Sequence, residues 1–160
     1  MYERFQVYRF GFEYPKGCTI SFGKHPSRAN GYVRMDLAER ERIFVSWGQL
    51  DSIPPDREST DDHARVSLSR LGKARDVKEV RLMEHSSVDF NGHPATLTHL
   101  QIDSAIPFFS RERNRDVRSI HVHCFDSGRY FILNESCSAS DSSEDSLRIF
   151  KKLRESFVCH

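Results

Sequence analysis

Apolar and polar residues alternate along the first third of the chain. Phe10, Phe12 and Tyr14 alternate with Gly11 and Glu13, and this period of two is typical of a β-strand with one buried face. The same pattern predicts further strands over residues 18–23, 31–37 and 42–48. The last two are separated by a short polar segment, so we expect them to form a hairpin.

A period of three and four residues then predicts a helix. Ser59 or Thr60 can cap its N-terminus, and the helix is expected to end near Gly72. One apolar stripe is expected to face a sheet, and it consists of Ala64, Leu68 and Leu71.

A second helix is predicted from about residue 143 to 157. Ser142 and Asp145 resemble a capping box at its start. Its apolar stripe consists of Leu147, Phe150, Leu153 and Phe157.

Between the two helices, the pattern predicts two long hairpins. Residues 77–103 fold back at Asn91-Gly92, a pair that suits the positive φ angles of a type I′ turn. In the simplest register Glu84 lies opposite His99. Residues 104–117 are expected to be a connection, and residues 119–125 and 129–137 to form the second hairpin around Gly128.

This order of elements predicts an α+β fold. Each helix carries a single apolar stripe and must bury it against a sheet. We therefore expect one domain over residues 1–160, built on a central, twisted, mostly antiparallel sheet with the helices packed across it.

Three short motifs in order resemble the PsbP-like superfamily. They are Phe10-Gly11-Phe12-Glu13-Tyr14-Pro15, Phe90 to Ala95 around Asn91-Gly92, and Tyr130 to Ser136 followed by a helix that ends in Ser156-Phe157. This superfamily includes the PsbP subunit of photosystem II and the Mog-type Ran-binding import factor. The resemblance implies an α-β-α sandwich, and a binding or accessory role more often than catalysis.

Composition narrows the function further. The formal net charge is +1 and 29% of residues are charged, so no overall field favours nucleic acid or an anionic membrane. No apolar run approaches the roughly 20 residues that span a bilayer. The N-terminus lacks the apolar core of a secretory signal, and a cytoplasmic location is expected. The four cysteines have no CxxC spacing, which favours free, buried thiols over a zinc ribbon.

His121-Val122-His123-Cys124 is the first candidate site. On a strand His121 and His123 share one face, whereas Cys124 points to the other. The two histidines can bind a metal ion if a third ligand joins them, and His99 and Glu84 are the candidates. The alternative is that these are polar residues on a half-exposed sheet face, and no cofactor is expected in that case.

Arginines in the 104–118 segment form the second candidate site. Four guanidinium groups follow two aromatic side chains and favour an acidic protein partner over nucleic acid. The alternative is a solvated connection whose phenylalanines pack back into the core. The residues of this partner-binding site are Phe108, Phe109, Arg111, Arg113, Arg115 and Arg118.

These features leave three hypotheses open. The first is a non-catalytic binding domain with a protein partner, because no GxSxG motif occurs. The second is a metal-dependent or thiol-dependent enzyme that uses the sheet-face histidines. The third is a homodimer formed by edge strands across a two-fold axis.

Overall fold

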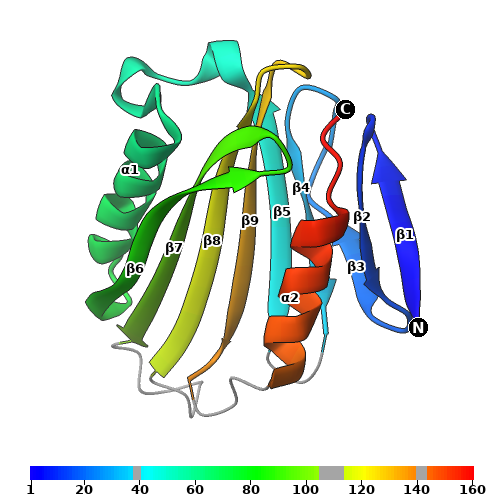
Figure 1. Ribbon diagram of the computed structural model, residues 1–160. Coiled ribbons are helices and arrows are strands. Elements are labelled where there is room, and N and C mark those ends of the chain that lie inside the picture. Colours follow the sequence, from blue (N-terminus) through cyan, green and yellow to red (C-terminus); the bar gives the residue numbers. More distant parts are fainter. Residues whose placement is uncertain (38–40, 105–113, 140–143) are drawn as a thin grey trace.

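The computed structural model describes residues 1–37, 41–104, 114–139 and 144–160, and Figure 1 shows their arrangement. Five strands precede the first helix, four lie between the helices, and α2 precedes the C-terminal segment. The bounds are β1 Tyr2–Val7, β2 Phe10–Pro15, β3 Thr19–Phe22, β4 Gly31–Asp36, β5 Arg42–Gln49, α1 Thr60–Gly72, β6 Val77–Phe90, β7 His93–Ser104, β8 Asn114–Cys124, β9 Arg129–Ser138 and α2 Glu144–Ser156. Two short 3₁₀ helices, η1 Leu50–Ser52 and η2 Pro55–Arg57, lie between β5 and α1.

Seven strands form the central sheet in the order β3-β4-β5-β9-β8-β7-β6, and β1 and β2 form a separate pair beside it. Every pairing in the sheet is antiparallel, and the sheet is visibly twisted (Figure 1). The predicted α+β class is therefore confirmed.

The β6–β7 hairpin folds back where the sequence predicts. Asn91 and Gly92 have φ angles of 54° and 86°, the left-handed values that a type I′ turn requires. Glu84 pairs with His99 as expected, and a bulge follows between Leu82 and Glu84. The turn sets the register of β6 and β7 from Phe90–His93 as far as the bulge beside Glu84.

The two helices cover opposite faces of the sheet, as two adjacent residues of β9 demonstrate. The ring of Tyr130 lies 5.0 Å from that of His63 in α1, whereas the ring of Phe131 lies 5.2 Å from that of Phe157 at the end of α2. Successive side chains of a strand point to opposite faces, so the molecule has three layers (Figure 1).

Aromatic rings fill the face beneath α2. Phe10 is buried and contacts both Trp47 and Phe131, at centroid distances of 4.9 and 5.3 Å. The Trp47 indole donates a hydrogen bond of 2.8 Å to the Ser27 carbonyl, which satisfies the only polar group of that side chain. The β1–β2 pair joins this core through Phe5 and Phe12, whose rings stack at 4.8 Å.

The predicted stripe of α2 is wrong at one position. Phe150 and Leu153 are buried, but Leu147 is 41% exposed. The buried position in that turn belongs to Ser146, which bonds to the buried carboxylate of Glu135. The helix is rotated so that this polar pair, not a leucine, faces the sheet. The predicted capping box cannot be placed, because Ser142 lies outside the described residues.

Strand β8 begins earlier than predicted. Residues 114–117 were assigned to a connection, yet they pair with β7 and β9. Their backbone groups continue the ladder of the second hairpin although charged side chains dominate the sequence there. Among the described residues no helix has the length and apolar character needed to cross a bilayer.

Candidate metal centre

The C-terminal segment lies across one end of the sheet and is held there by backbone contacts. Gly11 and Val158 exchange two hydrogen bonds of 2.9 and 2.8 Å. The Asn91 amide donates to the Phe157 carbonyl at 2.9 Å, and Arg129 donates to the Cys159 carbonyl at 3.1 Å. These bonds place the last two residues beside the start of β7 and the end of β8.

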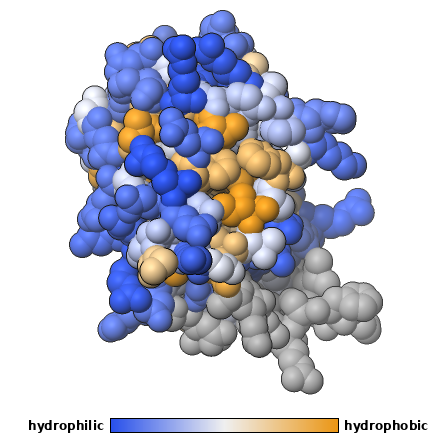
Figure 2. Space-filling view, turned by 90° about the vertical axis from the view of Figure 1, so that its right-hand side faces the viewer, coloured by the Kyte–Doolittle hydropathy of each residue, from blue (hydrophilic) through white to orange (hydrophobic). Residues whose placement is uncertain are grey.

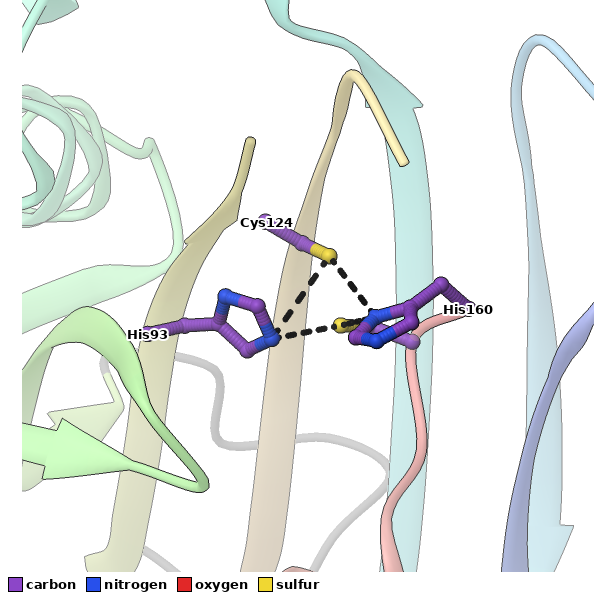
Figure 3. Close-up of side chains that lie close together, drawn as sticks. His93, Cys124 and His160 are labelled. Carbon is purple, nitrogen blue, oxygen red and sulfur yellow. Dashed lines mark hydrogen bonds between the residues drawn. The ribbon is translucent and has the colours of Figure 1, made fainter. Parts of the chain in front are cut away.

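Four metal-ligand side chains converge at this point. His93 begins β7, Cys124 ends β8, and Cys159 and His160 end the chain; their ligand atoms all lie within 4.8 Å of one another. Figure 3 shows the imidazoles and thiols turned toward a common centre. His93, Cys124 and Cys159 are buried, whereas His160 is exposed.

The distances match a tetrahedral ion. His93 Nε2 lies 3.8 Å from the Cys124 sulfur and 3.2 Å from the Cys159 sulfur. His160 Nδ1 lies 3.8 and 3.4 Å from the same two sulfurs. Zinc bonds of about 2.3 Å to sulfur and about 2.05 Å to nitrogen give a tetrahedral S···N edge of about 3.6 Å. The four groups are therefore placed so that one ion would fit between them with little movement.

The two thiols interact strongly with each other. A hydrogen bond from Cys159 lowers the pKa of Cys124, and the same bond, together with burial, raises the pKa of Cys159. By contrast, burial raises the pKa of the Cys137 thiol to about 11. Cys124 is thus already biased toward the thiolate form that binds metals.

Outer groups hold some of the ligands in place. The Asp126 carboxylate lies 4.0 Å from Nδ1 of His93, the ring nitrogen that faces away from the thiols. The Ser127 hydroxyl donates to the Cys124 carbonyl at 3.4 Å. A carboxylate on this side of a ligating histidine can orient the ring when it comes within hydrogen-bond distance, and at 4.0 Å Asp126 lies just beyond that distance.

Solved structures of known proteins resemble this chain over nearly its whole length. CyanoP, the cyanobacterial PsbP of Synechocystis sp. PCC 6803, superposes with a TM-score of 0.73 at 15% identity, over 99% of this chain and 92% of that one. This chain has the PsbP-like fold.

Two further structures extend the likeness. The Ran-binding protein Mog1p of Saccharomyces cerevisiae has a TM-score of 0.62 at 8% identity, over 99% of this chain and 95% of that one. PA94 of Pseudomonas aeruginosa, a protein of unknown function, has a TM-score of 0.58 at 13% identity, over 99% of this chain and 97% of that one. No protein-family model and no curated protein sequence matches the chain significantly. The resemblance read from the motifs is confirmed for the fold.

Within the PsbP-like fold, the predicted histidine site is only partly assembled. His121 and His123 share the α1 face, but His99 lies on the opposite face, where it bonds to Asp116 at 3.3 Å. His99 and Glu84 are therefore not brought to the pair, because strand alternation sends their side chains elsewhere. Glu84 bonds to Ser86 instead.

His63 of α1 takes the third position beside this pair. Its Nδ1 lies 3.4 Å from Nε2 of His123, and its ring centroid is 5.1 Å from that of His121. Burial lowers the pKa of His63 to about 4 and that of His121 to about 3, and it lowers that of His123 as well. These are uncharged imidazoles in the layer between helix and sheet.

The predicted arginine site can be placed only in part. Phe108, Phe109, Arg111 and Arg113 lie outside the described residues. Arg115 and Arg118 lie on β8 and not in a connection. Arg118 donates to the buried Glu135 carboxylate at 3.2 Å, so its charge already has a partner within the fold.

None of the four clustered ligands was predicted from the sequence, which placed Cys124 on the face away from the histidine pair and did not single out His93, Cys159 or His160. Their spacing carries no zinc-finger signature, because the four ligands come from β7, β8 and the C-terminus. One signal was present: the Asn-Gly turn fixes His93 at the first position of β7, and the hairpin β8–β9 fixes Cys124 at the end of its strand. The sequence did not show that the last three residues return to this end of the sheet and bring Cys159 and His160 to the other two ligands.

Proposed function

We propose that this protein is a non-catalytic binding domain whose C-terminus is fastened by one zinc ion. The observation that carries the proposal is the convergence of His93, Cys124, Cys159 and His160, whose ligand atoms lie within 4.8 Å of one another. Two thiolates and two imidazoles are a ligand set that zinc prefers. The two thiolate charges balance the charge of the ion.

The ligand number favours a structural role. Catalytic zinc sites keep one position open for water or substrate, whereas structural sites use four protein ligands. The ion would tie β7, β8 and the C-terminal segment together where three separate stretches of chain meet. The resulting rigid end of the sheet is a scaffold for recognition.

Metal analysis of the full chain, prepared without a histidine tag, tests the site. We expect one zinc ion per chain and, after exchange, the visible absorption of tetrahedral Co²⁺ with thiolate ligands. Cys159→Ser should abolish both, and Cys18→Ser, which alters a thiol outside the cluster, should leave them unchanged. Metal-free protein with an intact-mass loss of about 2 Da, the mark of a Cys124–Cys159 disulfide, would contradict the proposal.

The partner we propose is a protein. The fold supports this, since Mog1p, which is similar over most of the chain, is a Ran-binding protein. Arg111, Arg113 and Arg115 add positive charge suited to an acidic surface. A site that needs reduced thiols also suits a reducing compartment such as the cytoplasm.

Affinity purification from the native source tests the partner. The wild-type chain should retain an acidic protein that the Arg111/Arg113/Arg115→Ala triple variant does not retain, whereas Lys24→Ala, at an exposed position elsewhere, should behave as wild type. Light scattering of the purified chain distinguishes this from self-association. Equal recovery with the triple variant would remove these arginines from the proposal.

A further inference from the structure

A cavity separates α1 from the sheet on the face opposite the aromatic core. It measures about 290 Å³ and lies beneath the apolar side of the helix, which contributes Ala64, Leu68 and Leu71. The helix touches the sheet near its N-terminal end, where the hydroxyls of Thr60 and Thr96 lie 2.9 Å apart. The stripe predicted to pack directly on the sheet therefore covers a hollow.

The floor of this cavity contains a row of polar side chains. Thr98, Ser119 and Asn134 stand side by side on β7, β8 and β9, and all three line the hollow. Ser119 donates to the Asn134 side-chain oxygen at 2.5 Å. A sheet face buried under a helix would ordinarily carry Val, Ile or Leu at such positions.

The polar row lies between an apolar pair on one side and a mixed row of Thr96, His121 and Ile132 on the other. Leu100 and Val117 flank it on one side, and Ile132 lies on the other, next to His121. Nδ1 of His121 is buried and has no hydrogen-bond partner among the described residues. Buried polar groups in native proteins are normally satisfied by protein, water or a ligand, so this polar floor is arranged for an additional occupant.

The cavity carries no formal charge. None of the described residues that line it is Lys, Arg, Asp or Glu, and burial, which lowers the pKa of His121 to about 3, keeps that imidazole neutral. An ionised ligand would lose part of its hydration in this half-open cavity without gaining an opposite charge. An uncharged ligand has no such cost.

The size of the cavity restricts the ligand further. A dry protein cavity of about 150 Å³ holds benzene, and this one is about 290 Å³. By that comparison it accommodates about a dozen non-hydrogen atoms, which is close to the lower limit of ordinary ligand pockets. An apolar body fits the leucine roof, and one hydroxyl group fits the polar row.

We propose that this cavity is a binding site for a small uncharged molecule that combines an apolar aromatic or aliphatic body with a hydroxyl group. The hydroxyl lies over Thr98, Ser119 and Asn134, and the apolar body lies against Leu68 and Leu71. The site is separate from the metal centre and on the other face of the sheet, so it does not depend on the proposed function.

Titration of the full, metal-loaded chain with three matched probes tests the chemistry. The probes are 4-butylphenol, butylbenzene, which lacks the hydroxyl, and 4-butylbenzoate, which is charged. We expect 4-butylphenol to bind about tenfold more tightly than butylbenzene, the effect of one net hydrogen bond, and 4-butylbenzoate to bind most weakly. Binding is followed by chemical-shift changes of the leucine methyl groups.

Two variants, Leu68→Trp and Thr98→Val, locate the binding, and Leu147→Trp serves as a control. Leu68→Trp fills the cavity and should abolish binding of all three probes, whereas Leu147→Trp, at an exposed position of α2, should not. Thr98→Val keeps the side-chain shape and should remove most of the preference for the phenol while butylbenzene still binds. This second variant keeps the test decisive if Leu68→Trp does not fold.

Three outcomes would overturn the inference. One is the absence of saturable binding up to the solubility limit of 4-butylphenol, which means that water alone occupies the cavity. Another is undiminished binding to Leu68→Trp. The third is equal affinity for the phenol and butylbenzene, which would show that the polar row plays no part in recognition.

Discussion

The two faces of the central sheet are built on different principles although the same strands form both. On the α2 face, rings from β2, β5, β9 and the end of α2 contact one another at centroid distances of 4.9 to 6.2 Å. On the α1 face, the neutral imidazoles of His121 and His123 and a row of hydroxyl and amide groups lie beneath α1, which adds His63 and leaves a cavity of about 290 Å³. One face is an aromatic core, and the other is a lined hollow.

A four-residue stretch of β8 makes the difference concrete. His121 and His123 turn toward α1 and His63, whereas Val122 and Cys124 turn toward the α2 face, where Cys124 meets the C-terminal segment. Neighbours in sequence thus serve separate sites. The side of the molecule that carries β1 and β3 shows apolar residues of its own, which belong to neither site (Figure 2). The two candidate sites are therefore separated by the face of the sheet on which they lie, and not by the segment of chain that supplies them.

Metal removal is expected to have the largest effect, and it acts only on the α2 face. At a metal concentration about 1,000-fold above Kd, binding stabilises the folded state by about 4 kcal/mol, or about 10 °C in Tm for a chain of this length. Calorimetry with and without a chelator measures this. Cys159→Ala should have the Tm of the metal-free wild type, and the chelator should not change it. A wild-type Tm that the chelator does not alter would contradict the metal centre.

Truncating one apolar side chain on each face should separate the two kinds of packing. Phe150 is 3% exposed in the aromatic core, so Phe150→Ala should reduce the free energy of unfolding by about 3 kcal/mol. Leu68→Ala enlarges a hollow that already exists and should cost about 1 kcal/mol. Urea unfolding of both variants checks the order, and equal losses would mean that the α1 face is packed as tightly as the core.

Acid should weaken the α1 face through its buried histidines. The folded-state pKa of His63 is about 4, below its ordinary value of about 6.5, so the unfolded chain takes up the proton first. Stability is full above about pH 6.5 and falls as the pH drops toward 4. Between pH 7 and pH 5, His63 accounts for about 2 kcal/mol of the loss.

The His63→Leu variant isolates that contribution. Its free energy of unfolding should fall less between pH 7 and pH 5 than that of the wild type, because only the contribution of His63 has been removed. His25→Asn, at an exposed position with a φ of 53° that Asn tolerates, should keep the wild-type pH dependence. Parallel curves for His63→Leu and the wild type would show that this imidazole is not buried neutral.

The smallest effect is expected at the N-terminus of α1. The Ser59 hydroxyl accepts a hydrogen bond of 3.0 Å from the Asp62 backbone amide, and Ser59→Ala should cost about 1 kcal/mol. Amide exchange should quicken in α1 and not in α2, since only α1 loses its cap. Ser69→Ala, at an exposed position inside the same helix, should be neutral or slightly stabilising.

Much of the fold was predictable because its signals are local. The Asn91-Gly92 turn, the alternation of Phe10, Phe12 and Tyr14, and the Ser59 cap act within a few residues, and all three appear as expected. The exceptions depend on distant partners. Ser146 and not Leu147 occupies the buried position of its turn, where its hydroxyl donates a hydrogen bond to Glu135 on β9.

The candidate sites were less predictable for the same reason. Strand periodicity correctly separated His121 and His123 from Cys124, but it could not show that His63 of α1 completes the first group. Nor could it show that Cys159 and His160 complete the second. The alternation of β7 places His99, the third ligand suggested by the sequence, on the α2 face of the sheet. There it bonds to Asp116, away from His121 and His123.

By itself the sequence determined which side chains of each strand share a face, because that periodicity is a property of the extended backbone and needs no distant contact. Tertiary structure alone decided which of those side chains meet. The path of the C-terminal segment along Gly11 and the height at which α1 rests above β7, β8 and β9 arise from contacts between residues far apart in the chain. The metal centre and the cavity both depend on those two placements.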